Sequence, residues 1–271
     1  MRQLLVGHSI GRLALATRAK LEIFRSALFE PESLGMIAND QLATKIITRL
    51  CAPGSFFIDI GAHIGSVVSE VRHHNKEARI IAVEAVPEKA ENLRRRFRNV
   101  EVFSCALGES DGEVPFFVND KRSGYSSLKR RLEFQDELRE VKVLMRRLDD
   151  VAPSSEVDAI KIDVEGAELE VIRGGRQVLG GSRPTVLFES APGWSPQESS
   201  AREQLWWEFA HLEYVVVLPQ HVAHNHDGLS LKGFLESHVH PRRTTNYFAI
   251  AKERRLEVRD RARPIVGVKT A

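Results

Sequence analysis

The segment Phe56-Phe57-Ile58-Asp59-Ile60-Gly61-Ala62-His63-Ile64-Gly65 joins a short apolar run, an acid and two glycines. The apolar run predicts a buried strand, and Val67, Val68 and Val71 predict a helix after the glycines. Such a turn brings backbone N–H groups and a helix N-terminus toward a ligand, and glycine allows a close approach that a Cβ would block. The segment therefore predicts the floor of a nucleotide-type pocket.

Strands and helices alternate beyond this segment, which favours a parallel sheet with right-handed crossovers. Two last strands flank a His-rich loop without an obvious helix, and they are expected to form a hairpin with the final strand antiparallel. The sequence thus predicts an α/β fold with a doubly wound, Rossmann-like sheet. Further strands are expected at 79–84, 100–103, 157–163, 185–189, 214–218 and 246–251, with helices from Pro87, over 169–179 and around 205–209.

The rest of the chain surrounds a main domain predicted over 53–251. Residues 1–52 are expected to form a helical lead-in packed on the core, with an amphipathic helix over 2–25 and a second helix that begins at Asp40 as N-cap. Residues 109–150 interrupt the alternation and are too short for a separate core, so they predict an elaboration of the domain. Residues 252–271 hold seven Lys/Arg against three Asp/Glu and predict a basic, solvated and frayed tail.

Composition excludes several classes of protein. With 271 residues and 42% hydrophobic content the chain can form a full core, and a net charge of +2 says little about partners. Cys51 and Cys105 lie far apart, so neither a disulfide framework nor a zinc site is predicted. No stretch approaches the roughly 20 apolar residues of a membrane span. We therefore expect a soluble, cytoplasmic protein.

Four of the predicted strands end on acids. Asp59, Glu84, Asp163 and Glu189 hold these positions. Because the carboxyl ends of parallel strands line one crevice, all four carboxylates are expected to face a single cleft. The alternative for each is that the acid only caps the following helix.

The glycine pattern restricts the nucleotide. A dinucleotide site favours G-x-G-x-x-G, whereas this turn offers only Gly61 and Gly65, and no phosphate-binding lysine follows. An acid 25 positions after Asp59 suits a ligand with an adenosine and an amino-acid end but no pyrophosphate. An NAD-dependent oxidoreductase and a non-catalytic, cofactor-binding scaffold stay open as alternatives.

Several motifs, in this order along residues 39–190, resemble the FkbM family of S-adenosylmethionine-dependent methyltransferases. The resemblance implies the class I methyltransferase fold, with a seven-stranded, mostly parallel sheet, and bound S-adenosylmethionine. The I-K-I-D-V-E-G-A-E block at 160–168 is the most specific of the motifs. They read F-I-D-I-G-A-H-I-G, I-A-V-E-A-V-P, A-L-G, S-G-Y-S-S-L and I-K-I-D-V-E-G-A-E-L-E-V-I-R-G-G.

The resemblance also implies roles for individual residues. Glu84 would hold the ribose hydroxyls and Asp163 would lie beside the sulfonium. His63 departs from the family, which usually has Asn there, but both residues tolerate unusual backbone angles. The other implied contacts are Asp59, Gly61 and Gly65 at the methionine end, Ala85 and Val86 at the adenine edge, and Cys105 and Ala106 at the adenine ring.

Methyl transfer usually requires removal of a proton from a hydroxyl, and the candidate bases are Asp163, Glu165 and Glu189. The alternative for Glu165 is that acids are favoured at a helix N-terminus by the dipole alone. Mg²⁺ bound by Asp163 and Glu189 is the alternative, since carboxylate clusters suit that ion, but no metal site is favoured.

The predicted reaction is O-methylation of a small molecule, sugar, glycan or natural product. Nucleic acid is disfavoured as the acceptor, because the strand before Gly166 ends in D-V-E-G rather than a Pro-Pro-aromatic block. The histidines at 221–226 predict a polar loop over the cleft mouth. The oligomeric state is left open, with a homodimer among the alternatives.

Overall fold

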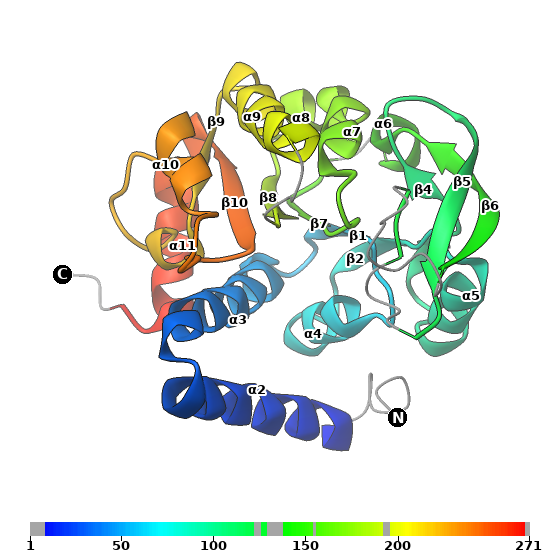
Figure 1. Cartoon of the computed structure of the whole chain (residues 1–271). Helices are drawn as coiled ribbons and strands as arrows, with labels where there is room; N and C mark the ends of the chain where they lie inside the picture. Colours follow the sequence, from blue (N-terminus) through cyan, green and yellow to red (C-terminus); the bar gives the residue numbers. More distant parts are fainter. Residues whose placement is uncertain (1–8, 122–125, 129–137, 154–155, 192–195, 269–271) are drawn as a thin grey trace.

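A sheet of seven strands forms the centre of the structure, and helices cover both of its faces (Figure 1). The computed structural model describes residues 9–121, 126–128, 138–153, 156–191 and 196–268. In chain order the strands of this sheet are β1 Phe56–Ile60, β2 Arg79–Val83, β3 Glu101–Phe103, β7 Ala159–Ile162, β8 Thr185–Glu189, β9 Tyr214–Val217 and β10 Asn246–Ala251.

Strand pairing confirms the predicted doubly wound, mostly parallel sheet. The order across the sheet is β3-β2-β1-β7-β8-β10-β9. β1 pairs in parallel with β2 and with β7, so the order reverses at β1. β10 runs antiparallel to β8 and β9, which confirms the expected antiparallel final strand. The carboxyl ends of β1, β2 and β7 therefore meet at the switch in strand order, where open α/β sheets bind ligands.

Alternate side chains of the strands enter two apolar layers, one on each face of the sheet. Phe57 and Phe248 pack with the helices on one face, whereas Ile58, Ile160 and Phe188 pack with the helices on the other face. No helix in the described ranges has the length and apolar character needed to cross a membrane. The α-helices described are α2 Ser9–Phe29, α3 Leu34–Leu50, α4 Ser66–His74, α5 Pro87–Arg96, α6 Leu148–Val151, α7 Glu168–Arg173, α8 Arg176–Ser182, α9 Pro196–His211, α10 Leu231–Glu236 and α11 Arg255–Val266.

A small second sheet accounts for the interruption predicted at 109–150. It consists of β4 Ala106–Leu107, β5 Gly112–Asn119 and β6 Leu138–Arg146, with β6 between the other two. Residues 122–125 and 129–137 of this segment lie outside the described residues. Apolar side chains of β5 and β6 pack against Val86 and Ala106, so this sheet closes one side of the main domain.

The prediction that the second helix begins at Asp40 is wrong. α3 begins at Leu34, and the Asp40 carboxylate instead accepts hydrogen bonds from the start of β10. Its Oδ1 accepts from Thr244 Oγ1 at 2.6 Å, from the Thr245 N–H at 3.0 Å and from the Asn246 N–H at 3.2 Å. Asp40 therefore fastens α3 to the edge of the sheet at which β8 ends.

Three other expectations were also wrong. The helix predicted over 169–179 is two helices, because the chain bends at Gly174, where a Cβ would lie 2.0 Å from the Gly108 carbonyl oxygen. Helix α10 lies between the last two strands, and Ser230 caps it by accepting from the Gly233 N–H. The tail expected to be solvated forms α11, which buries Val258 and Ala262 in the layer that contains α3.

Asp40→Ala is expected to lower the free energy of unfolding by about 2–3 kcal/mol, because it removes the acceptor of the Thr245 N–H and of the Thr244 and Thr245 hydroxyls. Urea unfolding of the full chain measures this. Asp120→Ala, which removes an exposed ion pair with Arg139, is the control and should cost no more than about 1 kcal/mol. Equal losses in the two variants would contradict the fastening role.

Candidate active site

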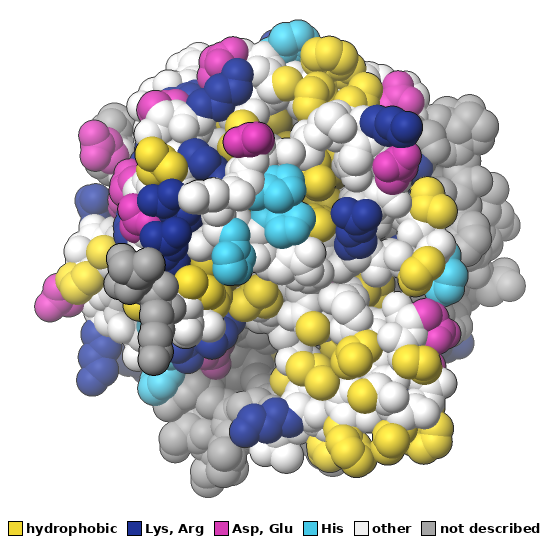
Figure 2. Space-filling view, turned by 90° about the vertical axis from the view of Figure 1, so that its left-hand side faces the viewer, with side chains coloured by type: hydrophobic (Ala, Val, Ile, Leu, Met, Phe, Trp, Pro, Cys, Tyr) yellow, Lys and Arg dark blue, Asp and Glu magenta, His cyan; other side chains and the backbone are white. Residues whose placement is uncertain are grey.

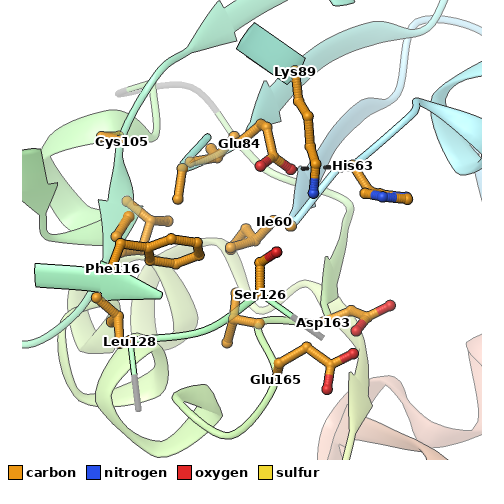
Figure 3. Close-up of a pocket in the computed structure, with 16 residues that line it drawn as sticks. Ile60, His63, Glu84, Lys89, Cys105, Phe116, Ser126, Leu128, Asp163 and Glu165 are labelled. Atoms are coloured by element: carbon orange, nitrogen blue, oxygen red, sulfur yellow. Dashed lines mark hydrogen bonds between the residues drawn. The ribbon is translucent and has the colours of Figure 1, made fainter. Parts of the chain in front are cut away.

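A cavity of about 740 Å³, counting space open to solvent, lies at the carboxyl ends of β1, β2 and β7 (Figure 3). Figure 3 shows Phe116 and Leu128 on one side of the cavity and Asp163 and Glu165 on another. The lining residues are Ile60, Gly61, His63, Val83, Glu84, Ala85, Lys89, Cys105, Ala106, Leu107, Phe116, Ser126, Leu128, Asp163, Val164 and Glu165.

The turn after β1 places two residues, Gly61 and His63, in backbone conformations with positive φ. Gly61 has φ +78°, and a Cβ there would lie 1.8 Å from the Asp163 carbonyl oxygen. The turn after β1 thus lies directly against the turn after β7. His63 has φ 50°, so histidine adopts the left-handed conformation at the position where the family usually has Asn.

The Glu84 carboxylate is held by two backbone N–H groups at the rim of this turn. It accepts from His63 N at 2.8 Å and from Val86 N at 2.9 Å, and it is almost completely buried. Burial raises the pKa of Glu84, although the Lys89 charge and the two N–H groups oppose that rise. These contacts fix the direction of the carboxylate beside the cavity.

A buried lysine that was not predicted as a site residue, Lys161, connects two predicted acids. Its Nζ lies 3.0 Å from Asp163 Oδ2 and 3.6 Å from Asp59 Oδ1. Asp59 is only 1% exposed and does not line the cavity, so it contacts Lys161 below the floor. In the sequence the signal for Lys161 was a single charge inside an apolar strand.

Three carboxylates meet just beyond β7 and β8. One oxygen each from Asp163, Glu165 and Glu189 lies within 4.8 Å of the others. Burial raises the pKa of Asp163, but the charge of Lys161 and hydrogen bonds from Glu189 and Lys161 outweigh it and hold the pKa below its ordinary value. Burial and the Asp163 charge raise the pKa of Glu189 well above its ordinary value. Of the two carboxyl groups, Glu189 therefore holds a proton more strongly than Asp163.

Glu165 reaches this group from a strained backbone. Its φ is 57°, which is uncommon for a residue with a side chain. The Ser127 hydroxyl donates to the Glu165 carbonyl oxygen at 2.7 Å and so ties this turn to the small second sheet, since Ser127 bridges Phe117.

The structure brings most of the predicted residues to the cavity, and their roles stay predictions. Gly61, His63, Glu84, Ala85, Cys105, Ala106, Asp163 and Glu165 line it. The expectation that all four strand-end acids face one cleft is wrong for Asp59. Gly65, Val86 and Glu189 are also absent from the lining. Gly65 is small for another reason, because a Cβ there would lie 2.5 Å from Phe97 and 2.7 Å from Leu93 on the α5 side.

Sequence reasoning assigned no role to four further lining residues. Lys89 comes from α5 and Phe116 from β5, and Ser126 and Leu128 belong to the S-G-Y-S-S-L motif. The residues from β5 and from the segment after it reach the cavity only because the second sheet packs beside it, and no local sequence pattern specifies that packing. The histidines of the predicted polar loop do not line the cavity; His221 and His226 stack on each other with ring centroids 4.0 Å apart.

A seven-stranded sheet with an antiparallel last strand and a carboxylate-lined cavity at its switch point define a class I methyltransferase fold. The family model of the methyltransferase FkbM domain matches residues 59–222. The chain belongs to this family, as its motifs predicted.

The individual relatives share less than 30% of their residues with this chain over the matched segments. The chain is 27% identical over 144 residues to methyltransferase 1 of Beauveria bassiana, a match that covers 44% of this chain and 58% of that protein. It is 24% identical over 189 residues to the 2-O-methyltransferase NoeI of Sinorhizobium fredii, covering 63% and 76%. The FkbM methyltransferase structure from Methylobacillus flagellatus aligns with a TM-score of 0.46 and 16% identity, over 73% of this chain and 44% of that one. The chain spans less than two thirds of the length of the first curated relatives it matches.

Glu189→Gln is expected to remove a pH dependence of stability. Folding raises the pKa of Glu189, so the folded chain binds the proton more strongly than the unfolded chain does. This stabilising contribution is fully present below the ordinary glutamate pKa of 4.5, and it is lost as the pH rises through the raised pKa of the folded chain. Across that window the wild type should lose up to about 1.4 kcal/mol per pH unit relative to the variant. Urea unfolding, measured at pH values about one unit apart between pH 4 and 9, gives the difference in free energy of unfolding. Glu236→Gln on α10 is the control, and parallel curves for wild type and Glu189→Gln would refute the raised pKa of Glu189.

Proposed function

We propose that this chain transfers a methyl group from S-adenosylmethionine to a hydroxyl of a small molecule, sugar or natural product. The observation that carries the proposal is the charge of the cavity. Within the described residues, the carboxylates of Glu84, Asp163 and Glu165 line it together with the ammonium of Lys89. This surplus of carboxylates favours a ligand with sulfonium and ammonium groups and opposes the pyrophosphate of a dinucleotide. Membership of the FkbM domain family supports the same reading.

The two ends of the cavity suit the two ends of this cofactor. Glu84, held by two N–H groups, retains carboxylate lone pairs for the ribose hydroxyls. Ala106, Leu107 and Phe116 offer an apolar wall to the adenine. Asp163, kept ionised by Lys161, offers a negative charge to the amino-acid end.

When bound, S-adenosylmethionine supplies an electrophilic methyl group on its sulfonium, and the protein must align an acceptor hydroxyl and remove its proton. Of the three neighbouring carboxylates, Asp163 is engaged by Lys161, and Glu189 does not line the cavity and has a raised pKa. Glu165 lines the cavity on a backbone fixed by Ser127, and we assign it the role of general base. The name of the relative NoeI, a 2-O-methyltransferase, supports a hydroxyl acceptor.

Mg²⁺ is the alternative partner of this carboxylate group. The ammonium of Lys161, 3.0 Å from Asp163 Oδ2, already pairs with one of the three carboxylates that would have to bind the ion. We therefore expect turnover that persists in EDTA.

Glu84→Ala is expected to weaken S-adenosylhomocysteine binding about 10- to 100-fold, because a hydrogen bond to a charged group contributes about 1.5–3 kcal/mol. Equilibrium dialysis with labelled ligand measures the dissociation constant. Glu88→Ala, an exposed glutamate on α5 that does not line the cavity, is the matched control and should bind as the wild type does. Unchanged affinity in Glu84→Ala would overturn the ribose assignment.

Methyl transfer itself is tested with methyl-labelled S-adenosylmethionine and a cell extract, and mass spectrometry locates the label. We expect it on a hydroxyl oxygen; a label on nitrogen or carbon, or none above the level without protein, would contradict the proposal. Glu165→Gln should lower the rate about 10²- to 10⁴-fold without changing S-adenosylhomocysteine affinity. Glu236→Gln serves as its control, and full activity of Glu165→Gln would exclude Glu165 as base.

A further inference from the structure

Helix α2 presents two opposite stripes, and only one of them contacts the rest of the described chain. Ser26 is buried, Ala19 and Ile23 are half-buried, and the Ala19 carbonyl accepts from Gln41 Nε2 of α3 at 3.0 Å. These three residues recur at the spacing of one helix face, since each residue turns the helix by about 100°. Figure 1 shows α2 at the outer side of α3, at the bottom of the molecule.

The opposite stripe is apolar and exposed. Leu21, Phe24 and Leu28 lie on it at i, i+3 and i+7, with exposed fractions of 61%, 64% and 59%, and Phe29 beside its end is 75% exposed. Eight large hydrophobic side chains are exposed in the described part of the chain, and these four are half of them. Figure 2 shows apolar side chains gathered at the bottom of the molecule, the level at which α2 lies in Figure 1. An exposed apolar patch of this kind marks an interaction site.

Basic side chains border the apolar stripe on both sides. At about 100° per residue, Arg18 and Arg25 fall on one side of the stripe and Lys20 on the other. All three are exposed, and α2 as a whole contains four Lys/Arg against the single acid Glu22. An apolar stripe between long basic side chains suits a helix that lies in a membrane surface, where the aliphatic stems stay in contact with lipid and the charges reach phosphates.

We propose that α2 is a membrane-surface helix that holds this protein on an anionic lipid bilayer. Leu21, Phe24 and Leu28 enter the boundary between headgroups and acyl chains, and Arg18, Lys20 and Arg25 contact lipid phosphates. A second copy of the chain is a poorer occupant, because two such stripes facing each other would bring their basic borders together. The inference is independent of the proposed methyl transfer.

Flotation of the full-length protein with vesicles tests the proposal. Vesicles of phosphatidylcholine and phosphatidylglycerol in a 3:1 ratio should bind the wild type at least about tenfold better than pure phosphatidylcholine vesicles. The triple variant Leu21→Gln, Phe24→Gln, Leu28→Gln should lose at least about tenfold of the binding to anionic vesicles. The separate charge variant Arg18→Gln, Lys20→Gln, Arg25→Gln should lose about 100-fold.

Leu256→Gln on α11 is the matched control, because Leu256 is 63% exposed on a different helix, and its binding should equal that of the wild type. Failure of the wild type to bind anionic vesicles would overturn the proposal, as would an equal loss in Leu256→Gln. Sedimentation velocity without lipid provides the third arm. A dimer that dissociates in the Leu21, Phe24, Leu28 variant would show that a second copy covers this stripe, and would also overturn the proposal.

Discussion

Lys161 extends from the middle of β7 to Asp59 on β1 and to Asp163 just beyond β7, and the candidate site depends on this contact. Asp59 is almost completely shielded from water, so a charge there is costly unless an opposite charge accompanies it. Asp59 and Lys161 are also register partners in the two strands at which the sheet order reverses. The same ammonium that stabilises the floor lowers the pKa of Asp163 above it, and the charge on Asp163 helps to raise the pKa of Glu189.

The walls of the cavity follow from the way three turns meet at that edge of the sheet. The turn after β1 lies against the Asp163 carbonyl because Gly61 has no Cβ, and its His63 N–H fixes Glu84 at the end of β2. Ser127 then connects the turn after β7 to the second sheet, which supplies the apolar wall. The segment 109–150, which interrupts the alternation of strands and helices, is therefore a part of the site.

Local sequence patterns predicted the strands, turns and helices that depend on residues close together in the sequence. The apolar run and glycines at 56–65 specified the strand and its turn, and alternating strands and helices specified a parallel sheet. Asp40 was misassigned because its partners lie 204 to 206 residues further along the chain. Helix α11 was missed since its many arginines obscure the two buried positions, Val258 and Ala262. Lys161 escaped notice because its role exists only when β1 and β7 pair.

The central claim is that a cavity whose charged lining residues are mainly carboxylates, at the switch point of the sheet, receives a cationic methyl donor rather than a dinucleotide. Calorimetric titration of the full chain with S-adenosylhomocysteine, and separately with NAD, tests it most directly. The account predicts saturable binding of S-adenosylhomocysteine and no heat of binding with NAD. Binding of NAD without binding of S-adenosylhomocysteine would contradict it.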